Sequence, residues 1–151
     1  LEILIPDDYV ESITERLSLY QRLDNCETDE ELELMKQEMH DRFGPIPQQV
    51  EDLFITVRCR KLAVALGFEK MSLKENTQRC FFINRADSPY FESDTFQKII
   101  EFLQTGTNKA KLKQTGKLFM LIANNMNSME EMHRFLQSMH TFCFSSVKTP
   151  Q

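Results

Sequence analysis

The apolar residues in the first half of the chain recur at intervals of three and four, a spacing that predicts three helices. We expect the first helix to begin at Asp7 or Asp8 and to reach Leu23, with an apolar face made of Val10, Ile13, Leu17, Tyr20 and Leu23. The second begins with a capping box at residues 28–31. Its core-facing stripe is Leu32, Met35, Met39 and Phe43. The third helix carries Val50, Leu53, Phe54, Val57 and Leu62, and it ends at Gly67.

The second half alternates strand patterns with helix patterns. The predicted strands form two hairpins, residues 68–74 with 78–84 and residues 109–114 with 117–123. Helices are predicted at 96–103 and from a second capping box at Ser128. We also expect a short strand over residues 1–5 and a flexible tail over 145–151. The predicted fold class is α+β, with three N-terminal helices followed by two antiparallel hairpins that alternate with two helices.

A fixed corner is predicted between the second and third helices, at Phe43-Gly44-Pro45-Ile46-Pro47. Gly44 can adopt the positive φ that ends a helix, and Pro45 cannot continue one. Pro47 suits the first turn of the next helix, where a missing N–H costs little. We therefore interpret Phe43, Gly44, Pro45 and Pro47 as residues that set the angle between the two helices.

Length, composition and net charge limit the classes of protein to which this chain can belong. With 151 residues and 41% hydrophobic residues, the chain is long enough for a single domain, 1–151, with a real core. It begins with Leu1, so we expect it to be part of a longer protein. The net charge of -5 argues against an obligate nucleic-acid binder. The sequence has no long apolar run and no signal-peptide pattern, so we do not expect a membrane or secreted protein. The four scattered cysteines indicate reduced thiols in a cytosolic protein.

The sequence contains few motifs that would indicate catalysis. The four glycines are too far apart for a phosphate-binding loop, and His40, His133 and His140 lack metal-site spacing. The many acidic pairs lie on polar helix faces, whereas a general acid needs a desolvated pocket. We therefore predict no catalytic residue, no metal or other cofactor and no small-molecule substrate. An enzyme would need a deep pocket lined with titrating groups.

The segment 24–41 contains eight Asp and Glu residues against one Lys. Glu38 and Asp41 lie near the negative end of the helix dipole, where the dipole does not favour acids. They are about 60° apart on the helical wheel, and Leu34 points outward between them. This pattern is typical of a contact surface for a partner that presents arginines. The alternative is a solvated face on which Glu38 pairs locally with Arg42.

A basic strip of Lys109, Lys111, Lys113 and Lys117 contains no acid, and Phe119 lies close to it. Because successive side chains of a strand point to opposite faces, the first three lysines lie on one side of the predicted strand. One interpretation is an accessory nucleic-acid-binding module. The other is an edge strand that its lysines protect from pairing with another chain.

Three segments carry a resemblance to a known family: residues 5–10 (IPDDYV), 16–20 (RLSLY) and 41–47 (DRFGPIP). They resemble the C-terminal domain of the bacterial transcription-repair coupling factors, and they cover about the first third of the chain. The family's parent protein is a cytoplasmic, ATP-driven DNA translocase that displaces stalled RNA polymerase and recruits UvrA for nucleotide excision repair. The motor motifs are absent from this chain, which the resemblance therefore identifies as non-catalytic.

The resemblance also implies a function and a partner. The domain would be autoinhibitory, docking on the N-terminal UvrB-like module of the same protein and masking its UvrA-binding surface. UvrA, RNA polymerase and DNA would then be indirect partners through the parent protein. The family's acidic contacts with the partner fall on Glu38 and Asp41. We add Leu34 from the helical wheel, and Arg42, to the predicted partner-binding residues.

Overall fold

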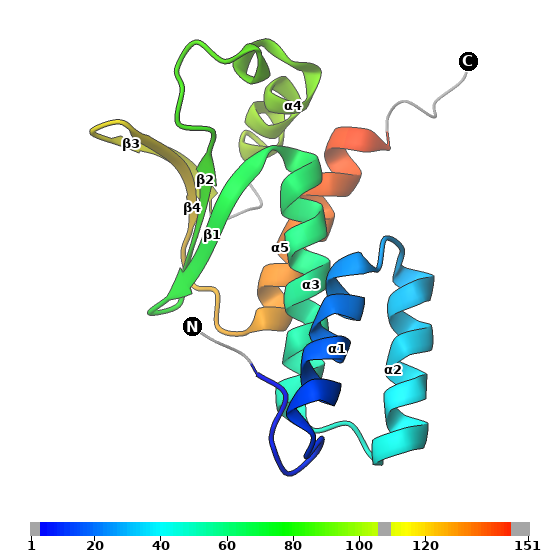
Figure 1. Ribbon diagram of the computed structural model, residues 1–151. Coiled ribbons are helices and arrows are strands. Elements are labelled where there is room, and N and C mark those ends of the chain that lie inside the picture. Colours follow the sequence, from blue (N-terminus) through cyan, green and yellow to red (C-terminus); the bar gives the residue numbers. More distant parts are fainter. Residues whose placement is uncertain (1–3, 106–109, 146–151) are drawn as a thin grey trace. The chain divides into compact units, whose positions relative to one another are not determined.

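The computed structural model describes residues 4–105 and 110–145, and the chain divides into two compact units, Leu1–Arg58 and Cys59–Gln151. In chain order the elements are α1 (Ile13–Asn25), α2 (Asp29–Phe43), α3 (Gln48–Leu66), β1 (Phe68–Lys74), β2 (Thr77–Phe82), the 3-10 helix η1 (Pro89–Glu92), α4 (Asp94–Leu103), β3 (Ala110–Thr115), β4 (Leu118–Ala123) and α5 (Met129–Phe144) (Figure 1). The predicted α+β class and order of elements are confirmed. That the whole chain acts as one domain stays a prediction.

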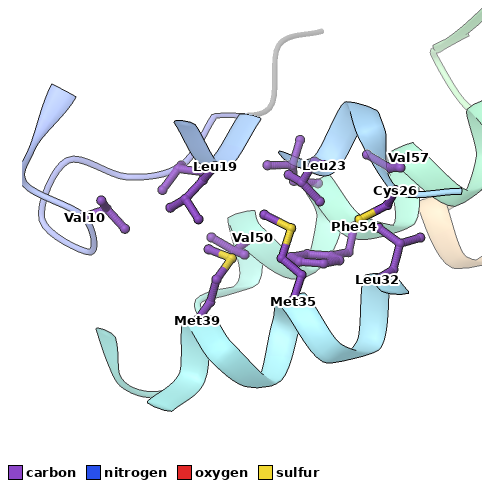
Figure 2. Close-up of a cluster of buried hydrophobic side chains, with 12 residues drawn as sticks. Val10, Leu19, Leu23, Cys26, Leu32, Met35, Met39, Val50, Phe54 and Val57 are labelled. Carbon is purple, nitrogen blue, oxygen red and sulfur yellow. The ribbon is translucent and has the colours of Figure 1, made fainter. Parts of the chain in front are cut away.

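The core of the first unit lies between α1, α2 and the first part of α3, with side chains from all three helices meeting in Figure 2. The predicted stripe of α2 is largely confirmed, because Leu32, Met35 and Met39 are buried. Phe43 is half-buried and packs against the edge of the cluster. Phe54 of α3 is fully buried among them.

The prediction for the first helix is wrong at its start and on its face. Residues 6–10 form a turn in which Tyr9 and Val10 donate their N–H groups to the carbonyl of Pro6, at 3.1 and 3.2 Å. Asp7 and Asp8 are therefore part of that turn, and Ser12 caps α1 by accepting from the N–H of Glu15. The buried side chains of α1 are Leu19 and Leu23, whereas Ile13 and Leu17 are exposed.

At the corner, Gly44 has φ +98° and ψ -171°, a conformation that is nearly restricted to glycine. The hydroxyl of Tyr9 lies 2.8 Å from the carbonyl oxygen of Gly44 and 3.2 Å from that of Met39, and it donates to this pair. Pro47 lies just before α3 rather than in its first turn, and its carbonyl accepts from the N–H groups of Val50 and Glu51. Tyr9 thus ties the turn before α1 to the corner after α2.

The two predicted hairpins of the second unit join into one antiparallel sheet with strand order β1-β2-β4-β3. The β1–β2 turn consists of Glu75 and Asn76, both with positive φ, as a two-residue hairpin turn requires. Thr115 pairs with Leu118, so the second turn lies one residue later than predicted. Of the expected first strand, residues 1–3 lie outside the described residues and Leu4 and Ile5 are not in a strand. The expected tail is described only at Ser145, which caps α5.

One face of the sheet forms the core of the second unit. Its fully or almost fully buried residues are Gln78, Cys80, Phe82, Leu121 and Ala123. The ring of Phe82 lies 5.4 Å from that of Phe96 in α4 and 5.9 Å from that of Tyr90 in η1. These contacts place η1 and α4 on the same face, and Figure 1 shows α4 and α5 together on one side of the sheet.

Both predicted capping boxes are present. The hydroxyls of Thr28 and Ser128 accept from the N–H groups of Glu31 and Glu131, each at 3.1 Å. In both boxes the glutamate carboxylate accepts from the N–H of the residue before the cap. In each helix the capping hydroxyl therefore satisfies one free N–H of the first turn, and the carboxylate fixes the residue before the cap.

Candidate functional site: the outer face of α2

Leu34 lies on the outer face of α2 and is 67% exposed, although leucine is among the most frequently buried residue types. The face around it is lined by Asp29, Glu30, Glu33 and Gln37. On its other side is a hollow of about 330 Å³ between α1 and α2, to which Arg22 and Glu38 also contribute. Leu34 is thus an exposed apolar side chain with acids of α2 beside it, and of the two acids that the helical wheel places around it, Glu38 lines the same hollow.

The structure places Glu38 in an ion-pair network within the first unit. Nη1 and Nη2 of Arg22 donate to Oε2 and Oε1 of Glu38, at 2.9 and 2.6 Å, which is a bidentate contact from α1 to α2. Arg42 approaches the same carboxylate at 3.4 Å and pairs with Glu15 at 3.0 Å. Hydrogen bonds from Arg22, supported by Arg42, lower the pKa of Glu38 to about 2. Glu38 and Arg42 therefore hold α1 against α2.

This pairing gives a pH-dependent prediction for Glu38→Gln. Because the folded pKa is lowered from 4.5 to about 2, the contribution of Glu38 to stability is present above pH 4.5 and disappears as the pH falls toward 2. We expect the variant to be less stable by about 1 kcal/mol at neutral pH, since the pair is bidentate but partly exposed. The difference from the wild type should vanish near pH 2.

Urea unfolding curves measured between neutral pH and about pH 2 check this expectation. Glu30→Gln is the matched control, because Glu30 is exposed on the same helix and has no ion pair in the described part of the chain. A wild-type advantage that stays constant over the whole pH range would contradict the assignment.

Asp41 is arranged differently. Its side chain is 82% exposed, and its Oδ1 lies 4.0 Å from Nδ1 of His40. No Lys or Arg pairs with it among the residues that the structure describes. The structure therefore does not bring Glu38 and Asp41 into one shared contact: Glu38 is held toward α1, whereas Asp41 is open to solvent.

The first unit as a whole is strongly acidic. It contains fifteen Asp and Glu residues against five Lys and Arg, a net charge of -10. All five basic side chains already pair with acids of the same unit: Arg16 with Asp7, Arg22 with Glu38, Lys36 with Glu51, Arg42 with Glu15 and Glu38, and Arg58 with Asp29 and Glu33. Acids therefore outnumber the basic side chains of this unit three to one.

The second predicted site, the basic strip, is only partly described. Lys111 and Lys113 are exposed on β3, and Lys117 lies in the β3–β4 turn. Lys109 lies outside the described residues. β3 is an edge of the sheet, in agreement with the edge-strand interpretation, and it leaves the nucleic-acid interpretation open.

Other kinds of site receive little support. Within residues 4–105 and 110–145, no three His, Cys, Asp or Glu side chains are grouped as a metal ion would require. Cys26, Cys59, Cys80 and Cys143 are free and buried, and burial raises the pKa of Cys59 and of Cys80 to about 12. None of the helices in the same ranges is long and apolar enough to span a membrane.

The model of the TRCF domain family matches residues 1–93, which is more than half of the chain. The chain belongs to the TRCF domain family. It is 35% identical to the transcription-repair-coupling factor of Rickettsia bellii over 118 residues, and 39% identical to that of Escherichia coli K12 over 72 residues. These matches cover 78% and 48% of this chain but only 10% and 6% of the relatives. The chain thus spans about a tenth of the length of the Rickettsia relative.

A solved structure also resembles this TRCF domain. The crystal structure of the C-terminal domain of transcription-repair coupling factor superimposes with a TM-score of 0.74 at 18% identity. The match covers 96% of this chain and 91% of that chain, and at this identity it supports the shared fold.

The three segments on which the family resemblance rests contact one another in this TRCF domain. Tyr9 of the first segment donates to Gly44 of the third, and the Tyr20 hydroxyl of the second accepts from the N–H of Ile5, at 2.6 Å. Arg16 donates to the carbonyl of Val10, also at 2.6 Å. Sequence reasoning missed these roles, although a tyrosine in each of two motif segments was a visible signal. Tyr9, Arg16 and Tyr20 of these segments therefore hold the first unit together.

Proposed function

We propose that this TRCF domain is a non-catalytic, autoinhibitory domain of a transcription-repair coupling factor of the bacterial cytoplasm. The parent protein would be an ATP-dependent DNA translocase that displaces stalled RNA polymerase and recruits UvrA for nucleotide excision repair. The domain would dock on the N-terminal UvrB-like module of the same protein and mask its UvrA-binding surface. Membership of the family supports the parent's activity, and the outer face of α2 supports the docking.

The observation that carries the docking proposal is the exposed Leu34 on a unit whose basic side chains are all committed to internal ion pairs. A partner that presents arginines would gain new charge-assisted hydrogen bonds to free acids such as Asp41 without competing with an internal cation. An apolar side chain surrounded by charges is also the usual arrangement of an energetic hot spot within a polar rim.

The structure changes the role that we assign to Glu38. Its carboxylate already accepts two hydrogen bonds from Arg22, so an incoming arginine would have to share it. We propose that Leu34 and Asp41 contact the partner, while Glu38 and Arg42 position α2 by fixing it to α1. Replacing Glu38 would therefore disturb docking through the geometry of the unit.

Substitutions in the full-length parent protein test this proposal. Leu34→Asp and Asp41→Arg each leave the core and the Arg22–Glu38 pair intact. Loss of one hot-spot contact weakens docking by about 2 kcal/mol, or about 30-fold in the docking equilibrium. We expect a several-fold rise in basal ATPase activity, and UvrA binding without engaged polymerase.

Val64→Asp and Asp8→Arg are the matched controls, because Val64 is an exposed apolar residue of the second unit and Asp8 an exposed acid outside α2. Both should leave ATPase activity and UvrA binding unchanged. Folding of each variant is checked by circular dichroism. Well-folded Leu34 and Asp41 variants with wild-type ATPase activity and UvrA binding would refute the proposal.

A further inference from the structure

The strand register places a set of basic side chains on the sheet face opposite the core. Residues that are directly paired across an antiparallel sheet share a face. Arg79 pairs with Ile122, which pairs with Lys111, and Phe81 pairs with Met120, which pairs with Lys113. On β1, Lys70 pairs with Phe81, and Lys74 pairs with Thr77. The outer face therefore consists of Lys70, Ser72, Lys74, Thr77, Arg79, Phe81, Lys111, Lys113, Thr115, Leu118, Met120 and Ile122.

Five of these twelve positions are Lys or Arg, and none is Asp or Glu. None of the five cations has an ion pair within the described part of the chain. In the first unit, by contrast, every Lys and Arg is paired. The second unit has thirteen Lys and Arg against eight Asp and Glu, a net charge of +5 that the chain's overall charge conceals.

Edge protection explains only part of this arrangement. Lys70 and Lys74 lie on β1, and Lys111 and Lys113 lie on β3, which are the two edges of the sheet. Lysines there hinder pairing with another chain. Arg79, however, lies on the inner strand β2, where both neighbouring strands are already paired. Its charge needs another explanation.

The middle of the face is apolar: Met120 and Ile122 are buried, and Phe81 is paired with Met120. Phe81 is half-buried, and the Nζ of Lys70 lies 5.4 Å from its ring centroid. At strand spacings of about 4.8 Å, the lysine rows of β1 and β3 lie about 14 Å apart on either side of it. Rows of cations beside an aromatic platform are the usual means of binding single-stranded nucleic acid, whose phosphates meet the cations while a base stacks on the ring. A duplex would hide its bases from Phe81.

We propose that the outer face of the sheet, with Lys70, Lys74, Arg79, Lys111 and Lys113 around Phe81, binds single-stranded nucleic acid. The site is independent of the proposed docking face on α2, because it uses different residues of a different unit. The proposed site adds three cations of the first hairpin, Lys70, Lys74 and Arg79, to the basic strip that was predicted from the sequence.

Fluorescence anisotropy with the 151-residue chain tests the proposal. The probe is a labelled oligothymidylate of about 20 nucleotides, titrated between about 50 and 200 mM salt. Five phosphate contacts predict a slope of log affinity against log salt of about -3.5. Arg79→Gln with Lys113→Gln should weaken binding about tenfold at low salt and reduce the slope to about -2. Phe81→Ala should also weaken binding about tenfold, through lost stacking.

Lys98→Gln with Arg134→Gln is the matched control, since it removes two positive charges from α4 and α5 of the same unit. This control should bind the probe within about twofold of the wild type, which would show that position matters and not net charge alone. Equal losses in the two double variants, or no binding of the oligothymidylate, would overturn the proposal. Equal or tighter binding of a duplex or of poly-glutamate would overturn it as well.

Discussion

Replacing Gly67 with alanine is expected to lower the free energy of unfolding of the second unit by about 3 kcal/mol or more. Gly67 has φ +95°, a conformation that costs an L-residue energy by itself. An added Cβ would also clash with Cε1 of Tyr90. The ring cannot simply move away, because the Tyr90 hydroxyl donates to the carbonyl of Leu66 at 2.6 Å.

Gly116→Ala is the control for the backbone part of this effect. Gly116 also has positive φ, +61°, but nothing lies within 4 Å of the position of its missing Cβ. We expect a loss of about 1 kcal/mol there. Urea unfolding followed by circular dichroism measures both variants. Similar losses at the two glycines would mean that the contact with Tyr90 does not restrict Gly67.

Phe82→Ala is the second variant with a large expected effect, a loss of about 4 kcal/mol in the free energy of unfolding. Phe82 is 3% exposed, and five aromatic rings surround it at centroid distances from 5.0 to 6.1 Å. Removing its ring leaves a cavity between the sheet, η1 and α4. Those surroundings come from several elements, so they cannot easily close around a methyl group.

The adjacent Phe81 provides the control, since it differs in facing the outer side of the sheet. Phe81→Ala should cost only about 1 kcal/mol, because the ring is half-buried and leaves no enclosed cavity. The same urea denaturation experiment compares the two. If Phe81→Ala costs as much as Phe82→Ala, the assignment of the two faces is wrong. A folded Phe81 variant is also what the nucleic-acid titration requires.

Patterns in the sequence predicted most elements because their signals were local. The two capping boxes, the Glu75-Asn76 turn and Gly67 each act over a few residues, and the structure has an element beginning or ending at each. The face of α1 was different. Ile13 and Leu17 form one apolar stripe and Leu19 and Leu23 another, and only packing against α2 and α3 decides which is buried. The prediction chose the face that contains Ile13 and Leu17, which the packing leaves exposed.

Interactions between distant segments could not be predicted in the same way. The sequence suggested Arg42 as the partner of Glu38 because it is four residues away, whereas the closer contact comes from Arg22 on another helix. For the basic strip, alternation put Lys111 and Lys113 on one side of a strand. Only the pairing of β2 with β4 shows that Arg79 lies on the same face. Such neighbours depend on the order of strands, which a single sequence does not reveal.

The hydrogen bonds of Tyr9 and Tyr20 set a limit on how this domain can be shortened. The Tyr9 hydroxyl holds the corner at Gly44, and the N–H of Ile5 donates to the Tyr20 hydroxyl. Residues 4–12 are therefore part of the core, although none of them is in a helix or strand. A fragment that begins at Ser12, where α1 is capped, would keep every helix of the first unit. It would nevertheless lose Ile5 and Val10 from the buried cluster and leave the corner without its donor. A fragment that keeps these contacts therefore has to include Ile5, well ahead of the first helix.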